Sequence, residues 1–362
     1  MPGVYISYPF CAQKCTYCNF ASGVLPEELE AEYLGALGQE IGRHEWRWRP
    51  ETMYLGGGTP SRLSVRELEE LLAEVPGRPW AEATIEAAPG GITSELANGW
   101  KRVGITRVSL GVQSFVEAEL RLTGRRHSAE VVEREIGVLR EAGIEEINVD
   151  LIAGLAAQTQ ESWRESLEWI RRMDPPHVSV YMLEVDEDSR LGLEILREGS
   201  RYGAGSVPNE DQVARFYEIA VEELGRIGLE RYEISNFARA GSESRHNLKY
   251  WLLEPYAGFG VDAHGFDGQV RRQNTDDVRE YVARLRGGQE AVVETREAFA
   301  GERFWVGLRL ARGVRASDSE MERHGKSIER LKSDGLLSQE GNLLRLTARG
   351  VLLSNEVFQE FL

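Results

Sequence analysis

The 362-residue chain has 43 Lys and Arg against 59 Asp and Glu, a formal net charge of −16. Because an acidic surface disfavours nucleic acid and anionic lipid, we expect no nucleic-acid partner. No apolar run is long enough to cross a membrane, and the first residues lack the features of a secretion signal. We therefore expect a cytoplasmic protein without a membrane span.

Short apolar runs alternate with helical patterns through the first half of the chain. We expect strands at residues 4–8, 52–55, 84–87, 107–112, 147–152 and 178–183. Helical patterns follow at residues 26–45, 64–72, 93–103, 128–143, 159–173 and 210–229. The polar, Gly-rich segment 186–208 before the last of these is expected to be a loop or lid. Repeated strand–helix units predict an α/β fold with a parallel sheet. Because the alternation stops after residue 183, we expect a partial (β/α)6 barrel of the TIM type.

The rest of the chain has a different character, and we expect three domains. Residues 1–200 would form the barrel core, and 201–297 an extension with one further strand at 232–237. Residues 298–362 would form a small winged-helix-like domain. Its expected elements are a helix at 304–310, two short helices within 317–331, a hairpin at 336–346 and a last helix after Thr347. The domain lacks an excess of basic residues, which argues against DNA binding.

Three cysteines, Cys11, Cys15 and Cys18, follow the first strand with the spacing C-x3-C-x2-C. Three thiolates can bind three irons of a [4Fe–4S] cluster and leave the fourth iron open to a small ligand. A disulfide framework needs an even number of cysteines, and a structural zinc site needs a fourth ligand close by. Buried structural cysteines are not expected to gather among polar residues. The pattern therefore predicts an iron–sulfur cluster.

Other unusual residues fall at the carboxyl ends of the next strands. They are the run Gly56, Gly57, Gly58 and Thr59, together with Glu86, Gln113 and Asp150. Active sites of β/α barrels are built at this edge, so these residues should converge with the cysteines. Each has an ordinary structural interpretation when it is considered alone: a tight turn, an interior ion pair or a loop clamp.

Six segments together resemble one part of the radical SAM superfamily, which uses a [4Fe–4S] cluster and S-adenosylmethionine (SAM). This part is the group of oxygen-independent coproporphyrinogen oxidases and HemW heme chaperones. The segments are Tyr-Pro-Phe-Cys at 8–11, Gly-Gly-Gly-Thr-Pro-Ser at 56–61, Gly-Val-Gln-Ser-Phe at 111–115, Leu-Thr-Gly-Arg at 122–125, Asn-Val-Asp-Leu-Ile-Ala-Gly-Leu at 148–155 and His-Asn-Leu-Lys-Tyr-Trp at 246–251.

The resemblance implies a role for each of the residues singled out above. The three cysteines would bind the cluster, and the amino and carboxylate groups of SAM would chelate its fourth iron. The glycine run and Thr59 would lie along SAM, and Glu86, Gln113, Arg125 and Asp150 would hold its polar groups. An electron donor would reduce the cluster, and electron transfer would split SAM into methionine and a 5′-deoxyadenosyl radical.

Three features favour a heme chaperone over an oxidase. Only three residues precede the first strand, where the oxidases have an extension. Phe20 stands where the oxidases have a further cysteine. The block that begins at His246 is associated with heme, so His246 is the predicted heme-binding residue, with His264 or no single fixed ligand as alternatives. The expected partners are heme and an unknown heme-accepting protein. Coproporphyrinogen oxidation and radical chemistry on another substrate remain alternatives, and Ala88, Asp262 and Gly265 depart from the family pattern.

Overall fold

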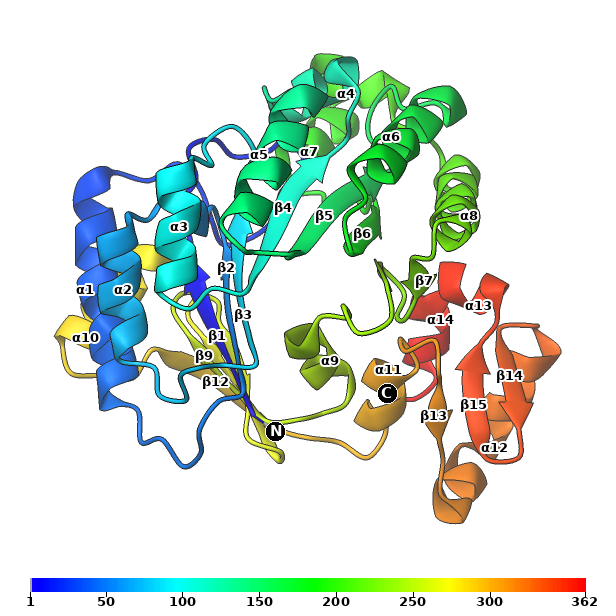
Figure 1. The fold of residues 1–362 in the computed structure, drawn as a ribbon. Coiled ribbons are helices and arrows are strands. Elements are labelled where there is room, and N and C mark those ends of the chain that lie inside the picture. Colours follow the sequence, from blue (N-terminus) through cyan, green and yellow to red (C-terminus); the bar gives the residue numbers. More distant parts are fainter. Residues whose placement is uncertain (1) are drawn as a thin grey trace.

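The computed structural model describes residues 2–362, and its core is a sheet of six parallel strands. They are β1 (Gly3–Tyr8), β2 (Thr52–Gly57), β3 (Glu82–Ala87), β4 (Arg107–Gln113), β5 (Glu146–Ala153) and β6 (His177–Met182). They pair in chain order, and each pair is parallel. The sheet curves around a concave interior with helices on its outer side (Figure 1). This arrangement confirms the predicted partial barrel.

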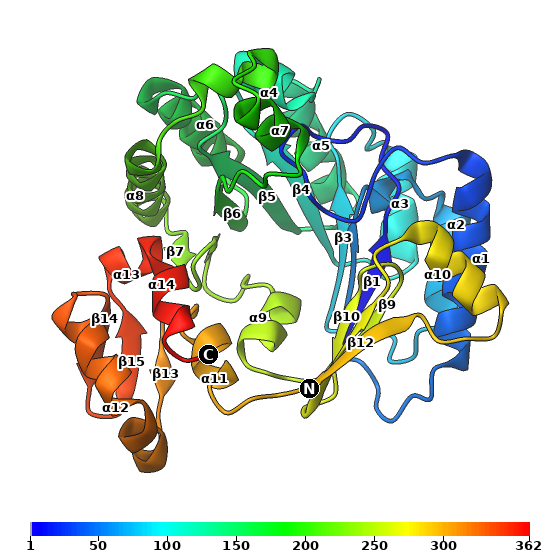
Figure 2. The same cartoon turned by 180° about the vertical axis from the view of Figure 1, so that it is seen from behind.

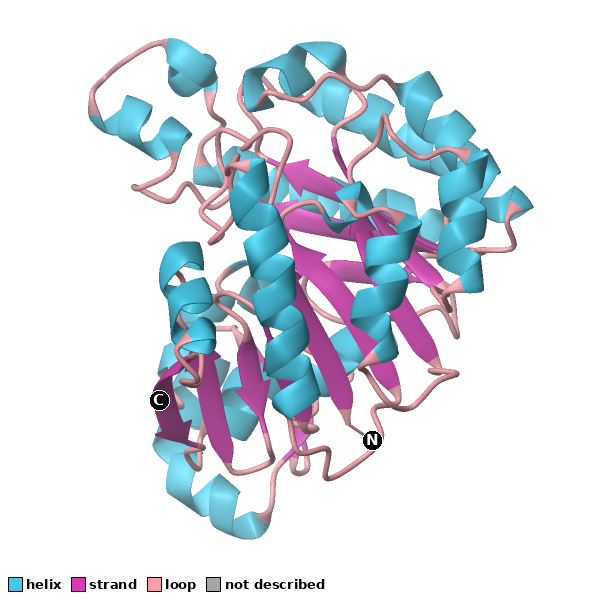
Figure 3. Ribbon diagram, turned by 90° about the vertical axis from the view of Figure 1, so that its left-hand side faces the viewer, coloured by secondary structure: helices cyan, strands magenta, loops and turns pink. Residues whose placement is uncertain are grey.

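Amphipathic helices cover the outer face of the strands (Figure 3). They are α1 (Glu27–Arg43), α2 (Val65–Ala73), α3 (Ser94–Arg102), α5 (Ala129–Glu141), α6 (Gln160–Met173) and α8 (Glu210–Arg226). In α1 the helical spacing buries Tyr33, Leu37 and Ile41 against the sheet. Ser64 begins α2 with the expected capping box to Glu67. Sequence analysis missed the short α4 (Glu117–Thr123).

The segment 201–297 extends both edges of the same sheet. At one edge, β8 (Asn236–Ala238) pairs antiparallel with β6, and β7 (Glu230–Arg231) pairs with β8. At the other, β9 (Tyr256–Phe259) pairs parallel with β1 and leads to β10 (His264–Phe266), β11 (Val270–Asn274), α10 (Val278–Arg286) and β12 (Val292–Glu297). The single strand expected at 232–237 is wrong, because buried Glu233 accepts hydrogen bonds from the Ser235 N–H and the Asn236 amide and folds the chain into a turn.

The expected lid at 186–208 is not simply a loop. It contains α7 (Arg190–Leu196) and a 3-10 segment, η2 (Arg201–Ser206). Ser189 caps α7 by accepting from the Gly192 N–H, and Leu191 is buried. The Leu191 N–H donates to the Thr16 carbonyl at 2.8 Å, so α7 lies on the cysteine loop. Burial of one leucine and a side-chain cap therefore stabilise a helix in a segment whose composition favours a loop.

The last part of the chain forms α11 (Glu302–Gly307), β13 (Val314–Arg315), α12 (Asp318–Ser333), β14 (Leu337–Glu340), β15 (Leu343–Leu346), α13 (Ala348–Leu352) and α14 (Ser354–Gln359). Figure 2 shows these elements together beside the open edge of the barrel. The predicted hairpin is confirmed as β14 and β15, with Gly341 at a φ of 58°. The two expected helices within 317–331 are instead the single helix α12, which begins at a capping box of Ser317 and Glu320 and buries Ile328 and Leu331 near its end. None of the helices in the described residues has the length and apolar character that a membrane crossing requires.

Candidate functional site

A cavity of about 470 Å³ lies at the carboxyl ends of the parallel strands. All three cysteines line it, together with Gly57, Gly58, Thr59, Glu86, Gln113, Arg125 and Asp150, whereas the predicted Gly56 is buried and does not line it. These residues come from five separate strand ends. Their convergence follows from the parallel order of the strands, which brings every carboxyl end to one edge.

Backbone hydrogen bonds hold the cysteine loop closed. At its base the Cys11 N–H donates to the Gly23 carbonyl at 2.8 Å, and the Gly23 N–H donates to Pro9 at 2.9 Å. Further along, the Thr16 N–H donates to the Thr123 carbonyl at 3.2 Å. Contacts with neighbouring segments thus fix the path of the loop, and its three cysteines line one cavity.

The thiols are free and half-buried. Burial raises the pKa of the Cys11 thiol, and the nearby Cys18 and Cys15 raise it further, whereas hydrogen bonds from Thr59 and Ser22 lower it. Among residues 2–362, no three His, Cys, Asp or Glu side chains converge closely enough to bind one metal ion. Three corners of an iron–sulfur cube bind three different irons, so ligands to a cube are spread apart rather than focused on one point.

The glycine run packs directly against the base of the cysteine loop. Gly57 has a φ of +109°, which favours glycine, and its N–H donates to Glu86 Oε2 at 3.0 Å. A Cβ on Gly58 would lie 2.8 Å from the Phe10 carbonyl oxygen and from the Pro9 carbonyl carbon. Glycine is therefore required here for close backbone contact, as well as leaving the cavity wall free of side chains.

Two carboxyl groups face the cavity from neighbouring parts of the sheet. Glu86 accepts from the Tyr54 hydroxyl at 2.8 Å and from Gly57, and Asp150 accepts from Ser109 at 3.0 Å and Asn148 at 2.7 Å. Burial raises the pKa of Glu86 to about 7, and the nearby Asp150 contributes to this rise. Burial also raises the pKa of Asp150. A cationic ligand between the two groups would favour their ionised forms.

Arg125 and Gln113 lie together over Gly111. A Cβ on Gly111 would lie 3.2 Å from the Gln113 amide nitrogen and 3.4 Å from an Arg125 guanidinium nitrogen. Arg125 Nη1 donates to the Gly111 carbonyl at 2.6 Å, and its Nε is buried without a partner in the described residues. A buried donor that lacks a partner indicates a missing acceptor. The residues of this cavity therefore fit a cluster with a small zwitterionic ligand.

Sequence analysis missed several residues that shape the cavity. Tyr54, Ser109 and Asn148 hold the two carboxylates, and His127 lines the cavity with a pKa lowered to about 4 by burial and by Arg125. A signal was present in one case, because residues two apart on a strand share a face. Asn148 is related in this way to Asp150.

The predicted heme residue lies elsewhere. His246 is fully buried in α9 (Arg245–Trp251), and its Nδ1 lies 2.8 Å from Thr52 Oγ1 while its Nε2 lies 2.8 Å from the Tyr250 hydroxyl. Thr52 is the first residue of β2, so His246 packs at the amino ends of the strands, opposite the cavity. The structure does not bring His246 together with the other predicted site residues.

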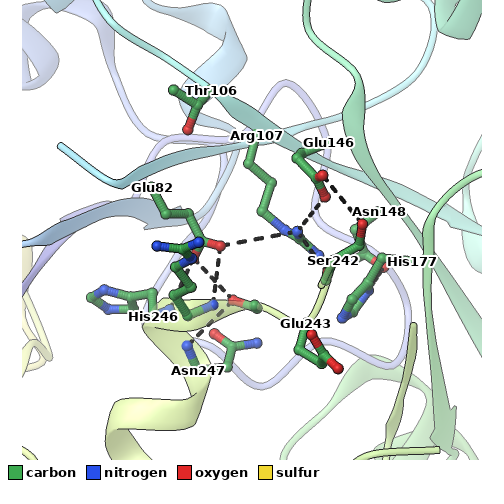
Figure 4. Close-up of polar contacts among 12 residues, drawn as sticks. Glu82, Thr106, Arg107, Glu146, Asn148, His177, Ser242, Glu243, His246 and Asn247 are labelled. Atoms are coloured by element: carbon green, nitrogen blue, oxygen red, sulfur yellow. Dashed lines mark hydrogen bonds and ion pairs between the residues drawn. The ribbon is translucent and has the colours of Figure 1, made fainter. Parts of the chain in front are cut away.

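A polar network surrounds α9 at this amino end (Figure 4). Glu82, the first residue of β3, accepts from the N–H groups of Arg245 at 3.0 Å and His246 at 2.9 Å. Arg107, the first residue of β4, contacts Glu82 at 4.0 Å and Glu146, the first residue of β5, at 3.2 Å. The first residue of β3 thus binds the start of α9 directly, and the first residues of β4 and β5 support it through ion pairs. These contacts hold α9 at the amino end of the barrel.

Comparison with known proteins agrees with this architecture. The radical SAM superfamily model matches residues 5–170, and the model of the HemN C-terminal domain matches residues 295–353. The structure of coproporphyrinogen III oxidase (HemN) from Escherichia coli, described as a radical SAM enzyme, superimposes with a TM-score of 0.84 at 22% identity. The match covers 99% of this chain and 90% of the oxidase, and it shows a shared fold.

The sequence is more similar to proteins named heme chaperone HemW than to this oxidase. The heme chaperone HemW of Bacillus subtilis is 34% identical, and the match covers 100% of this chain and 99% of that protein. HemW of Mycobacterium tuberculosis is 33% identical over 99% of this chain and 94% of its own length. HemW of Escherichia coli is 33% identical over 74% and 72%. From this full-length similarity and the radical SAM fold, the chain belongs to the HemW family of heme chaperones within the radical SAM superfamily.

Proposed function

We propose that the protein binds a [4Fe–4S] cluster, SAM and heme, and that it transfers heme to an acceptor protein. The observation that carries the proposal is the cavity at the carboxyl ends. There, three cysteines and two carboxyl groups line one cavity, and the carboxyl groups accept hydrogen bonds only from neutral donors among the described residues. The full-length similarity to proteins named heme chaperones supports the heme function over coproporphyrinogen oxidation.

Cys11, Cys15 and Cys18 would hold the cluster. When it is bound and reduced by an electron donor, the cluster supplies an electron to the sulfonium of SAM. Each thiol would lose its proton on binding iron, so cluster assembly should be favoured at higher pH. The backbone bonds at the loop base keep the three thiols on the same wall during assembly.

The other residues of the cavity would position SAM. The backbone of Gly57 and Gly58 would lie along its amino acid part, next to Thr59, where no side chain intervenes. The free Nε of Arg125 is suited to a carboxylate, and Gln113 lies beside it.

The two carboxyl groups complete the proposed SAM site. Glu86 and Asp150 would accept hydrogen bonds from the ammonium or ribose hydroxyl groups of SAM. In their ionised forms Glu86 and Asp150 would also attract the cationic sulfonium, beside the positive charge of Arg125, which already acts on Asp150.

Heme ligation by His246 remains a prediction from sequence. It would require the hydrogen bond at the ligating ring nitrogen to break and the fully buried ring to become accessible. His264, the alternative, lies on β10 and is exposed.

The proposal is tested by anaerobic reconstitution with iron and sulfide, followed by heme titration and by mixing with an apo-globin as heme acceptor. We expect a cubane spectrum, a Soret band on adding heme and transfer of that band to the globin. The triple variant Cys11→Ala, Cys15→Ala, Cys18→Ala serves as the cluster-free control. Decarboxylation of coproporphyrinogen III at enzymatic rates, or a wild-type protein that binds no heme, would overturn the proposal.

A further inference from the structure

A chain of hydrogen-bonded side chains runs through the barrel from α9 to Asp150 in the cavity at the carboxyl ends, which we call the SAM cavity. His177, the first residue of β6, is 1% exposed and lies in the middle of this chain, beside Asn148 of β5 (Figure 4). Its Nδ1 is 2.6 Å from Asn148 Oδ1, and its Nε2 is 2.9 Å from the Tyr232 hydroxyl. The Ser244 N–H, at the N-cap of α9, donates to the Tyr232 hydroxyl at 3.2 Å. Hydrogen bonds therefore join α9 to Asn148, which contacts Asp150.

The network allows a single orientation of the Asn148 amide. Its Nδ2 makes its two shortest contacts, at 2.7 Å each, with Asp150 Oδ1 and Ser109 Oγ, and the Ser109 hydroxyl donates to Asp150 Oδ2 at 3.0 Å. Both amide protons thus lead to the carboxylate, one directly and one through Ser109. With the amide reversed, its oxygen would face a carboxylate oxygen, and two acceptors would meet. The Asn148 oxygen therefore points to His177 and can only accept.

This orientation fixes the proton position on the His177 ring. Burial and the nearby Arg107 lower the pKa of His177 well below its usual range, so the ring is neutral and carries one proton. Because the Asn148 oxygen can only accept, that proton lies on Nδ1. The other nitrogen, Nε2, then accepts from the Tyr232 hydroxyl, whose oxygen accepts from the Ser244 N–H. Every donor in the chain thus points away from α9 and toward the SAM cavity.

A chain of donors in one direction is suited to hold a negative charge at its end. Hydrogen bonds that point the same way polarise one another, so each bond strengthens the next. Burial raises the pKa of Asp150, whereas hydrogen bonds from Ser179, Asn148 and Ser109 lower it. The chain therefore favours the ionised form of Asp150 and fixes the direction of its carboxylate.

We infer that His177 is a positioning residue for SAM, which acts through Asn148 on Asp150. His177 does not line the SAM cavity, so it makes no contact with the ligand itself. Without its Nδ1 proton the Asn148 amide would be free to reverse, and Asp150 would lose a donor. The inference rests on the proposed function, in which Asp150 binds SAM. It also gives the amino end of the barrel a part in the ligand site, because the first donor of the chain belongs to α9.

The test is the affinity of the full chain with reconstituted cluster for SAM, measured by equilibrium dialysis. The matched variants are His177→Gln and His177→Asn. The shorter Asn side chain places its amide near the position of Nδ1 and can still donate to Asn148, whereas the Gln amide reaches the position of Nε2. We expect His177→Gln to weaken SAM binding roughly 10-fold, as loss of an outer-shell partner does at a metal site, and His177→Asn to retain most of the affinity. Bound iron and sulfide control for loss of the cluster.

A double-mutant cycle distinguishes positioning from general damage to the fold. In the Asp150→Asn background, His177→Gln should weaken SAM binding no further, because its effect passes through the Asp150 carboxylate. Additive losses would indicate a purely structural role and overturn the inference. Nitrogen-15 spectra of the imidazole rings give a second readout without SAM, with the His177 signals assigned by their loss in His177→Asn. We expect a neutral ring protonated at Nδ1, and protonation at Nε2 would also overturn the inference.

The outcomes separate this inference from the proposed function. If the cluster-loaded wild type binds no SAM, the proposed function itself fails. If the wild type binds SAM and a folded His177→Gln protein binds it equally well, the positioning role is wrong and the proposed function stands. If His177→Gln does not fold, Tyr232→Phe takes its place, because it removes only the hydroxyl that donates to Nε2. It should weaken SAM binding in the wild-type background and have no effect beside Asp150→Asn, and any other result would count against the chain.

Discussion

The two ends of the parallel barrel neutralise their buried charges differently. At the carboxyl ends, Glu86 and Asp150 accept hydrogen bonds only from neutral groups within the described part of the chain. At the amino ends, Glu82 faces Arg107, and Lys249 pairs with Glu51 at 2.9 Å. The carboxyl end therefore leaves two carboxyl groups without an ion pair among the described residues, with Arg125 nearby, whereas the amino end uses ion pairs to fix α9.

This difference separates residues that bind from residues that stabilise. A buried carboxylate without a cation is costly, and such groups gather at functional sites because a ligand completes them. A buried ion pair already satisfies the charges of both partners, so neither partner is available to a ligand. Removing one partner strongly destabilises the folded protein. The His246 block, which in sequence resembles a binding motif, lies at the stabilising end.

The largest expected effect is at the carboxyl end. Replacing Cys15 by Ser should abolish cluster assembly, since the other two thiols cannot hold the cube alone, and bound iron and sulfide should fall close to zero. The protein should remain folded because backbone hydrogen bonds close the loop at Cys11 and Gly23. Thr16→Ala is the control within the same loop. Full retention of iron and sulfide by the Cys15→Ser protein would contradict the proposed cluster site.

At the amino end, Arg107→Met should lower the free energy of unfolding by about 3–5 kcal/mol, because it leaves Glu82 and Glu146 without their shared buried cation. Urea unfolding measures the change, and cluster content should be unaffected in the folded protein. Arg66→Ala, which breaks an exposed helical pair with Glu70, should leave the unfolding midpoint unchanged. If the two variants lowered the free energy of unfolding equally, the amino-end network would not have the stabilising role assigned to it.

The pH dependence of stability should differ between the two ends, and the effect of His246 should be the larger. Burial lowers its pKa to about 3, so between pH 6.5 and 3 the unfolded chain binds a proton that the folded chain does not. Stability should fall as pH falls through this range, by at most about 1.4 kcal/mol per pH unit. His246→Gln should flatten this part of the curve. A wild-type slope in the variant would indicate that His246 is not buried as a neutral ring.

Glu86 should show the opposite sign. Its pKa is raised to about 7, so between pH 4.5 and 7 the folded chain without ligand binds a proton that the unfolded chain has lost. Stability should fall as pH rises through this range, with the same limit of about 1.4 kcal/mol per pH unit. Glu86→Gln should remove this slope and weaken SAM binding, which equilibrium dialysis would measure. An unchanged affinity for SAM would exclude Glu86 from the SAM site.

Much of the fold was predictable because it depends on local patterns. Helix α2 begins at Ser64 since the capping box lies within four residues, and the hairpin turns at Gly341 since glycine tolerates a positive φ. The gathering of Cys11, Glu86 and Asp150 was also predictable, because parallel strands in chain order place all their carboxyl ends at one edge.

By itself, the sequence determined the strand–helix order and the gathering of the cysteines, Glu86, Gln113 and Asp150 at the carboxyl ends of the strands. Only the tertiary structure decided what surrounds each histidine. His246 is enclosed because Thr52 and Glu82, far away in the chain, begin the strands on which α9 packs. His177 contacts Tyr232, 55 residues later in the chain, because β8 pairs antiparallel with β6. Contacts between distant segments leave no periodic pattern in either segment, and for this reason neither environment could be inferred in advance.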